Sequence, residues 1–145
     1  MTSSAHHYYL RVYYEDTDAG GVVYHASYLR FAERARTEAL RDAGSPHAQM
    51  ERLHGTIFMV RRIEIEYLRP ARLDAWLRIA TSVEHVGGAS VRLRQVVSEG
   101  EDTVAVLTVG LVCVGLGDGR PARIPDRWRD VLMAGLGDLD RGSNG

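Results

Sequence analysis

Residues 74–114 read DAWLRIATSVEHVGGASVRLRQVVSEGEDTVAVLTVGLVCV, and this stretch divides into three strand candidates separated by two short turns. The strands and turns occupy, in order, residues 74–86, 87–88, 89–98, 99–102 and 103–114. Long consecutive strands joined by tight turns pair antiparallel. The stretch therefore predicts a three-stranded antiparallel meander, which ends at the glycines of residues 115–119.

One long helix is predicted ahead of the meander, over residues 27–43. Its small and aromatic side chains recur at steps of three and four, at positions 28, 32, 35, 39 and 43. Ser27 is a candidate N-cap, and Gly44 and Pro46 end the pattern. The alanines of this stripe allow the helix to lie close against a sheet.

Two more strand candidates and a short helix complete the element order. The strands lie at residues 8–14 and 63–67, and residues 125–136 form the helix. One long helix against an antiparallel sheet is an α+β layer architecture. Because a single helix covers such a sheet incompletely, its open edge and face favour pairing with a second copy.

Composition indicates one soluble domain. The chain has 145 residues, 45% of them hydrophobic, and we expect a single domain over 7–136 with flexible termini at 1–6 and 137–145. Its net charge is -1 and no basic block stands out, which argues against nucleic acid as a partner. No stretch has the signature of a signal peptide or the length of a membrane span, so a cytoplasmic protein is predicted.

Several chemistries are excluded by residue type or spacing. All 18 basic residues are Arg, so a lysine nucleophile or Schiff base is excluded. The lone cysteine, Cys113, allows no internal disulfide and fits a buried core thiol. The six histidines do not have HExxH spacing, and the chain has no pair of cysteines, so no metal site is expected.

The segment before the long helix, YEDTDAGGVVYH at 14–25, carries the chemistry. It places the carboxylate of Asp18 ahead of two glycines and a helix N-terminus. Free backbone N–H groups there can stabilise an oxyanion while the carboxylate attacks a carbonyl or activates water, as acyl transfer requires. In the alternative interpretation, Asp16 or Asp18 only caps the loop and His25 packs at the helix start.

The sequence at 14–28 and 33–38 closely resembles the signature of the YbgC-type acyl-CoA thioesterases of the 4-hydroxybenzoyl-CoA thioesterase family. The resemblance continues at 60–62, 66–67, 70–74 and 112–114. It implies a hotdog fold, an antiparallel sheet wrapped around one long central helix. It also implies homodimers paired edge to edge, commonly assembled as homotetramers, with active sites at the dimer interface.

The resemblance also implies roles for individual residues. Asp18 matches the catalytic carboxylate, as nucleophile or general base, and the N–H of His25 would polarise the thioester carbonyl. The side chains of Tyr14 and His25 match further important residues, and of Tyr13 and Tyr14 we expect one to be core and one to face the site. No cofactor is required, since coenzyme A is part of the substrate.

Arginines and a turn are candidates for holding the CoA phosphates, because Arg grips phosphate with paired hydrogen bonds. The candidates are Arg61, Arg62, Gly88, Ser90 and, with lower priority, Arg92 and Arg94. Any one of these arginines could equally be a solvated residue on a strand.

The resemblance also makes Glu33 a candidate, since in related hotdog thioesterases an acid further along the helix can serve catalysis. The competing interpretation is that Glu33, Arg34 and Arg36 form a helix surface. Asp18 is preferred because its loop position matches the family signature.

Two other functions fit the same sequence. A hotdog hydratase or dehydratase would keep the fold, but the motif at 18–28 resembles thioesterases more closely. A scaffold for acyl carrier protein or the Tol-Pal cell-envelope system would need only weak hydrolysis. The presence of both Asp18 and His25 argues against a purely structural role.

Overall fold

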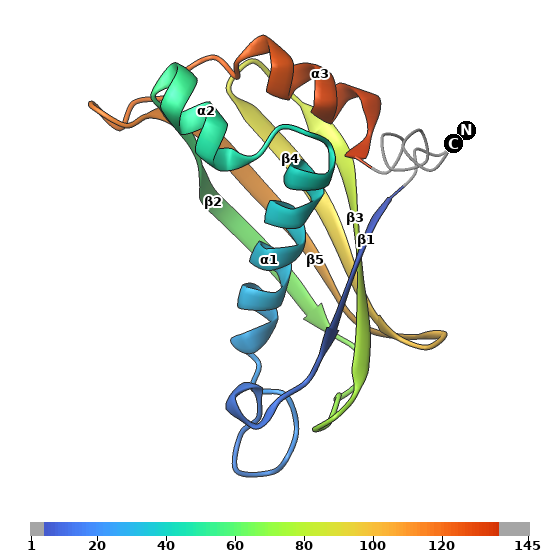
Figure 1. Ribbon diagram of the computed structural model, residues 1–145. Helices are drawn as coiled ribbons and strands as arrows, with labels where there is room; N and C mark the ends of the chain where they lie inside the picture. Colours follow the sequence, from blue (N-terminus) through green and yellow to red (C-terminus); the bar gives the residue numbers. More distant parts are fainter. Residues whose placement is uncertain (1–4, 137–145) are drawn as a thin grey trace.

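The computed structural model describes residues 5–136. Five antiparallel strands form one sheet in the order β1-β3-β4-β5-β2 (Figure 1). The strands are β1 His6–Arg11, β2 Thr56–Tyr67, β3 Trp76–Val86, β4 Ser90–Glu99 and β5 Asp102–Gly115. The helices are η1 Tyr14–Asp16, α1 Ser27–Asp42, α2 His47–His54 and α3 Asp126–Ala134.

The long helix α1 lies along one face of the sheet, while α2 and α3 lie together at one end (Figure 1). Ala32, Ala35 and Ala39 are fully buried on α1 beside Phe31. Three alanines at this spacing bring the helix backbone close to the strands, which buries apolar surface on both elements. The α+β architecture with one long central helix is as predicted, and α1 ends one residue before the predicted boundary.

The predicted meander is confirmed as β3, β4 and β5. The turn between β3 and β4 is closed by a 2.7 Å hydrogen bond from the N–H of Gly87 to the carbonyl of Ser90. A Cβ atom on Gly87 would lie 2.8 Å from the Ser90 hydroxyl oxygen, so a larger residue here would force the Ser90 side chain to move.

The first strand differs from the prediction at both ends. β1 covers His6–Arg11 rather than 8–14, so the ordered sheet includes His6, the last residue of the expected flexible segment. The strand ends early because the chain turns into η1 just after Val12, whose N–H still bonds the carbonyl of Ala75 on the side of the neighbouring strand. Residues 1–4 and 137–145, which hold the rest of the expected flexible termini, lie outside the described residues.

The N-cap prediction for Ser27 is wrong. Ala26 occupies the N-cap, and Ser27 is the first residue of α1. The Ser27 hydroxyl instead donates a 3.0 Å hydrogen bond to the carbonyl of Asp16, so it joins the helix to the preceding loop.

The outer strand β2 starts seven residues before the alternating segment at 63–67. A register shift between Val60 and Arg62 interrupts its pairing with β5, so the alternation is clear only after this bulge. In the described sheet β2 pairs with β5 alone, and its other edge has no strand partner. Between residues 5 and 136, no helix is long and apolar enough to cross a membrane.

Candidate active site

The loop between β1 and α1 folds back on itself as a small hairpin. Thr17 pairs with Val23, the Asp18 N–H bonds the carbonyl of Val22 at 2.9 Å, and the Gly21 N–H bonds the carbonyl of Asp18 at 3.0 Å. Gly21 has φ of 81°, a conformation that favours glycine. The two glycines of the motif thus allow a tight turn with Asp18 beside it.

The Asp18 carboxylate is exposed, and the backbone orients it. Its Oδ1 accepts a 2.8 Å hydrogen bond from the N–H of Gly20. A Cβ atom on Gly20 would lie 3.3 Å from the same oxygen, so glycine leaves room for the carboxylate. Among the described residues, no other group donates a hydrogen bond to this carboxylate. One oxygen is therefore held while the other is open to a reacting group.

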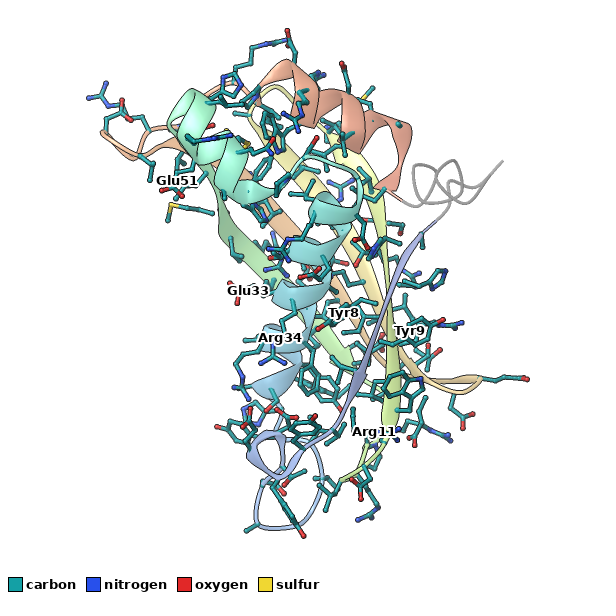
Figure 2. All side chains as sticks on the ribbon, viewed as in Figure 1. Tyr8, Tyr9, Arg11, Glu33, Arg34 and Glu51 are labelled. Carbon is teal, nitrogen blue, oxygen red and sulfur yellow. The ribbon has the colours of Figure 1, made fainter. Side chains whose placement is uncertain are left out.

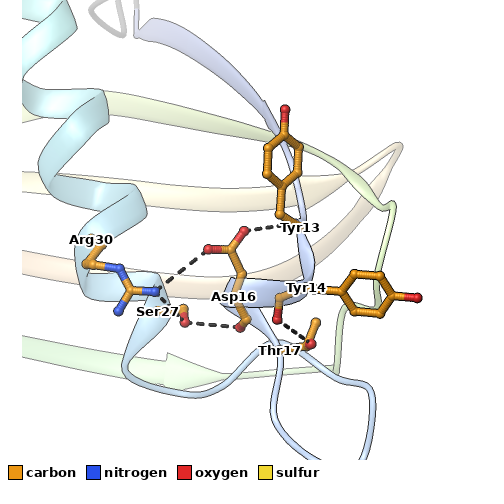
Figure 3. Close-up of polar contacts among 6 residues, drawn as sticks. All are labelled: Tyr13, Tyr14, Asp16, Thr17, Ser27 and Arg30. Carbon is orange, nitrogen blue, oxygen red and sulfur yellow. Dashed lines mark hydrogen bonds and ion pairs between the residues drawn. The ribbon is translucent and has the colours of Figure 1, made fainter.

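Asp16 has a different role, which Figure 3 shows. Its side chain is buried, and its Oδ2 accepts a 2.8 Å hydrogen bond from the N–H of Tyr13. Its Oδ1 lies 3.7 Å from the guanidinium of Arg30 on α1, and its carbonyl accepts the hydroxyl of Ser27. Asp16 therefore anchors the loop to the first turns of the helix. Of the two carboxylates, Asp16 serves structure and Asp18 is left available.

His25 is exposed, so it does not pack into the core at the helix start. Its carbonyl accepts a 3.0 Å hydrogen bond from the hydroxyl of Tyr67, at the end of β2. Its ring lies 4.4 Å from the ring of Tyr24, measured between centroids. Within residues 5–136, the backbone N–H groups of His25 and Ala26 donate no hydrogen bond. These N–H groups can therefore donate hydrogen bonds to a ligand oxygen at the beginning of α1.

The prediction that one of Tyr13 and Tyr14 is a core residue is wrong. Both side chains are exposed, at 62% and 80% respectively. The alternation of a strand does not reach them because β1 ends at Arg11. In Figure 3 the Tyr14 ring points away from Asp16 and Arg30, and the two tyrosines line a shallow pocket with Leu73 and Asp74. The structure does not bring Tyr14 into contact with Asp18.

Three of the four candidate CoA contacts come together. Arg61, Arg62 and Ser90 line one groove of about 500 Å³, together with His85 and Arg92. Two of the arginines in this groove are paired with acids: Arg62 lies 3.5 Å from Glu64, and Arg92 lies 3.2 Å from Glu84. Gly88 and Arg94 do not line the groove, and the Gly88 carbonyl instead accepts the N–H of Ile124.

The groove and the Asp18 loop do not form one site within a single chain. The loop contacts β2 at Tyr67, whereas the groove lies around Arg62. These positions are five residues apart along the strand, a distance of roughly 16 Å at the rise of a β-strand. A substrate that used both would need a long, extended arm.

A cavity of about 360 Å³ was not anticipated from the sequence. It is bounded by α1 from Glu33 to Leu40, by α2, by residues near the end of α3 and by the sheet. Its apolar wall consists of Leu40, Ile57, Phe58, Val60, Val91, Leu93, Leu111, Leu132 and Leu136. Its polar side chains are Glu33, Arg36, Thr37 and His47.

The cavity corrects the prediction that Arg36 lies on a helix surface, because Arg36 is only 8% exposed. Burial lowers the pKa of Arg36, and burial together with nearby arginines lowers the pKa of His47. A sequence signal for Arg36 was present. It lies four residues after Ala32 and four before Leu40, on the buried stripe. Glu33 and Arg34 are exposed, as the surface interpretation proposed.

Among the described residues, no group of three or more His, Cys, Asp or Glu side chains could hold a metal ion. The chemistry available in the loop is that of a carboxylate beside free backbone N–H groups.

The model of the Thioesterase-like superfamily matches residues 12–134. The chain is 42% identical over 116 residues to the acyl-CoA thioesterase YbgC of Haemophilus influenzae, covering 80% of this chain and 85% of that protein. It is 42% identical over 128 residues to the acyl-CoA thioester hydrolase YbgC of Escherichia coli O6:H1, covering 86% and 93%. A probable thioesterase from Bartonella henselae superposes with a TM-score of 0.79 at 37% identity, covering 84% of this chain and 100% of that one.

These similarities extend over the whole domain rather than over the loop motif alone. They confirm the predicted hotdog fold and the thioester hydrolase activity. The chain belongs to the Thioesterase-like superfamily and, within it, to the YbgC-type acyl-CoA thioesterases.

Proposed function

We propose that the protein hydrolyses acyl-CoA thioesters to a carboxylic acid and CoA with Asp18 as the catalytic carboxylate. The observation that carries this assignment is the exposed Asp18 carboxylate, held by the Gly20 N–H on the loop that leads to unpaired N–H groups at the start of α1. As a general base, Asp18 takes a proton from the water that attacks the carbonyl carbon. As a nucleophile, it forms a mixed anhydride that water then cleaves. In both routes the carbon–sulfur bond breaks and the CoA thiol leaves.

Both routes place negative charge on the carbonyl oxygen in the transition state. The N–H groups of His25 and Ala26, aided by the positive end of the α1 dipole, supply donors for that oxygen. The hydrogen bond from Tyr67 to the His25 carbonyl supports the peptide that presents the Ala26 N–H. The backbone thus stabilises the oxyanion while the carboxylate moves the proton or makes the bond.

The free edge of β2 supports a homodimer in which two copies of β2 pair antiparallel. This edge exposes apolar side chains, Met59 at 49% and Val60 at 47%, which a partner strand would cover. Antiparallel pairing about the strand centre places the beginning of one β2 beside the end of the other. The His25 loop of one protomer, which contacts Tyr67, would then lie beside the cavity of its partner, which contains Ile57 and Phe58. A dimer of dimers would require a further contact through another face.

The groove lined by Arg61, Arg62 and Ser90 is the proposed anchor for the CoA phosphates. It concentrates arginines near the middle of β2, and the dimer would bring the loops of both protomers to the flanks of this position. His85 joins the proposed contacts and Arg92 is retained, while Gly88 is no longer included because it does not line the groove.

Acyl-CoA substrates imply a cytoplasmic location, where these thioesters are made and consumed. Acyl carrier protein presents its acyl group on the same type of phosphopantetheine arm and is therefore a second proposed partner. Association with the Tol-Pal system follows from the family resemblance and would be tested by co-purification.

The substitution Asp18→Asn tests the catalytic assignment. Asparagine keeps an oxygen for the Gly20 N–H but can neither attack nor take a proton at neutral pH, so thiol release from acyl-CoA should fall by about 10²-fold or more. Asp130→Asn is the matched control, because Asp130 is exposed on α3 and lines neither the groove nor the cavity. Equal thiol release by Asp18→Asn and the native protein, with unchanged oligomeric state, would refute the role of Asp18.

A further inference from the structure

The cavity between α1 and the sheet contains a buried positive charge, Arg36, that forms no ion pair among the described residues. Within the described part of the chain, the Arg36 guanidinium makes one hydrogen bond, of 3.1 Å to Oε1 of Gln95, and has no carboxylate within 4.0 Å. Burying a charged group costs free energy, and a guanidinium cannot avoid that cost by losing its proton, because it stays charged in proteins. Burial without an ion pair is costly, so the site favours an anionic ligand group.

Gln95 fixes the position of this charge. Its amide nitrogen donates to the carbonyl of Ala32 at 2.9 Å and to the hydroxyl of Thr81 at 3.0 Å. The amide orientation leaves Oε1 directed at Arg36. Because both ends of the Gln95 amide are bonded and the residue is fully buried, the guanidinium is held in place before any ligand binds.

The rest of the cavity suits a hydrocarbon. Nine of its lining residues are aliphatic or aromatic, and its volume of about 360 Å³ is within the range of small-molecule sites. Glu33, the acidic residue of the wall, is exposed and makes no ion pair with Arg36. Figure 2 shows Glu33 projecting from α1 on the side of β2 and away from Tyr8 and Tyr9 of β1. The Glu33 carboxylate opposes the effect of burial on the pKa of Arg36 from this exposed position, but it forms no ion pair with the guanidinium and so offsets the inner charge only in part.

The opening lies where an acyl group could enter. Glu33 and Val60 are the exposed members of the lining, so the cavity opens between α1 and the first half of β2. In the antiparallel dimer proposed above, this half of β2 adjoins the Asp18 loop of the partner. A thioester held at that loop can direct its acyl chain into the cavity, toward Arg36.

We infer that the cavity binds the acyl group of the substrate, with its apolar wall around the hydrocarbon and the Arg36 guanidinium against a carboxylate at the far end of the chain. The favoured substrates are then CoA monothioesters of dicarboxylic acids. This inference rests on the proposed function and adds the substrate class.

The test compares straight-chain acyl-CoAs with ω-carboxyacyl-CoAs of equal chain length, from six to twelve carbons by design, using thiol release. At the length that spans the cavity, the native protein should favour the ω-carboxyl substrate in kcat/KM by about 10- to 100-fold, the usual range for a charged hydrogen bond. Arg36→Met should reduce this ratio to about 1 or below. Arg34→Met, an exposed neighbour on the same helix, should leave both rates and their ratio unchanged.

A ratio near 1 or below at every length in the native protein overturns the inference, and this result needs no variant. Arg36→Lys keeps the charge and should retain part of the preference if Arg36→Met fails to fold. Calorimetry of free dicarboxylic and monocarboxylic acids with Asp18→Asn separates binding from catalysis. Selective binding of the dicarboxylic acid supports the cavity assignment even if Asp18 proves not to be catalytic, and indifference to the second carboxylate contradicts it.

Discussion

Two carboxylates that lie two residues apart have different roles because their surroundings differ. Asp16 is buried, and its carboxylate accepts a hydrogen bond from the Tyr13 N–H and lies 3.7 Å from the Arg30 guanidinium. Both of its oxygens therefore hold the loop in place. Asp18 is exposed, and among the described groups its carboxylate accepts a hydrogen bond only from the Gly20 N–H. From the sequence alone, either Asp16 or Asp18 could have been the residue that caps the loop. Their hydrogen-bond partners in the structure distinguish the two roles.

The close approach of Gly20 to Asp18 leads to a prediction at this scale. A Cβ atom in Gly20→Ala would lie 3.3 Å from Oδ1 of Asp18 and displace the carboxylate, so thiol release should fall by about tenfold, since small misplacements of a reacting group are costly. The measurement pairs thiol release with thermal unfolding. Gly117→Ala is the control, because its Cβ would meet nothing within 4 Å. Full activity in Gly20→Ala would show that this carboxylate position is not critical.

At the scale of the element, α1 combines a close-packed stripe with one buried charge. Alanines on this face allow the helix to approach the sheet, and Arg36 occupies a position where a larger gap remains as the cavity. Helix periodicity therefore predicts which face is buried, while the local distance between helix and sheet decides whether a long polar side chain fits there.

Ala35→Leu tests the close packing of α1. Ala35 is fully buried, so the added atoms should strain the helix–sheet contact and lower the free energy of unfolding by about 1–3 kcal/mol. Ala48→Leu is the control, because Ala48 is exposed on α2. It should change the free energy of unfolding by no more than about 0.5 kcal/mol. Urea unfolding measures both. An equally small effect at Ala35 would mean that the helix can shift to make room.

At the scale of the whole molecule, the separation of functional features suggests that one chain holds parts of a site. The Asp18 loop lies near the end of β2, the cavity near its beginning and the arginine groove around its middle. A strand-to-strand dimer would combine parts from two chains, which explains how 145 residues could enclose a large thioester.

Met59→Lys tests this assembly. Met59 is 49% exposed on β2, and a lysine there would place two charges at the proposed interface of the dimer. We expect light scattering to show a shift toward monomer at low concentration, and thiol release to fall in parallel with the loss of dimer. Met133→Lys, at an exposed position on α3, should change neither quantity. A fully active monomer would contradict the shared site.

The sequence by itself determined the element order, the long helix, the meander and the family, because periodicity, glycine-bearing turns and a local motif are all encoded by neighbouring residues. It also singled out Asp18, whose glycines follow directly in the chain. It misplaced Tyr13 and Ser27, because the turn after β1 and the start of α1 depend on hydrogen bonds that both residues donate to Asp16. Only the tertiary structure decided that Arg36 is buried against Gln95, 59 residues away, since the space around a side chain is set by packing between distant elements.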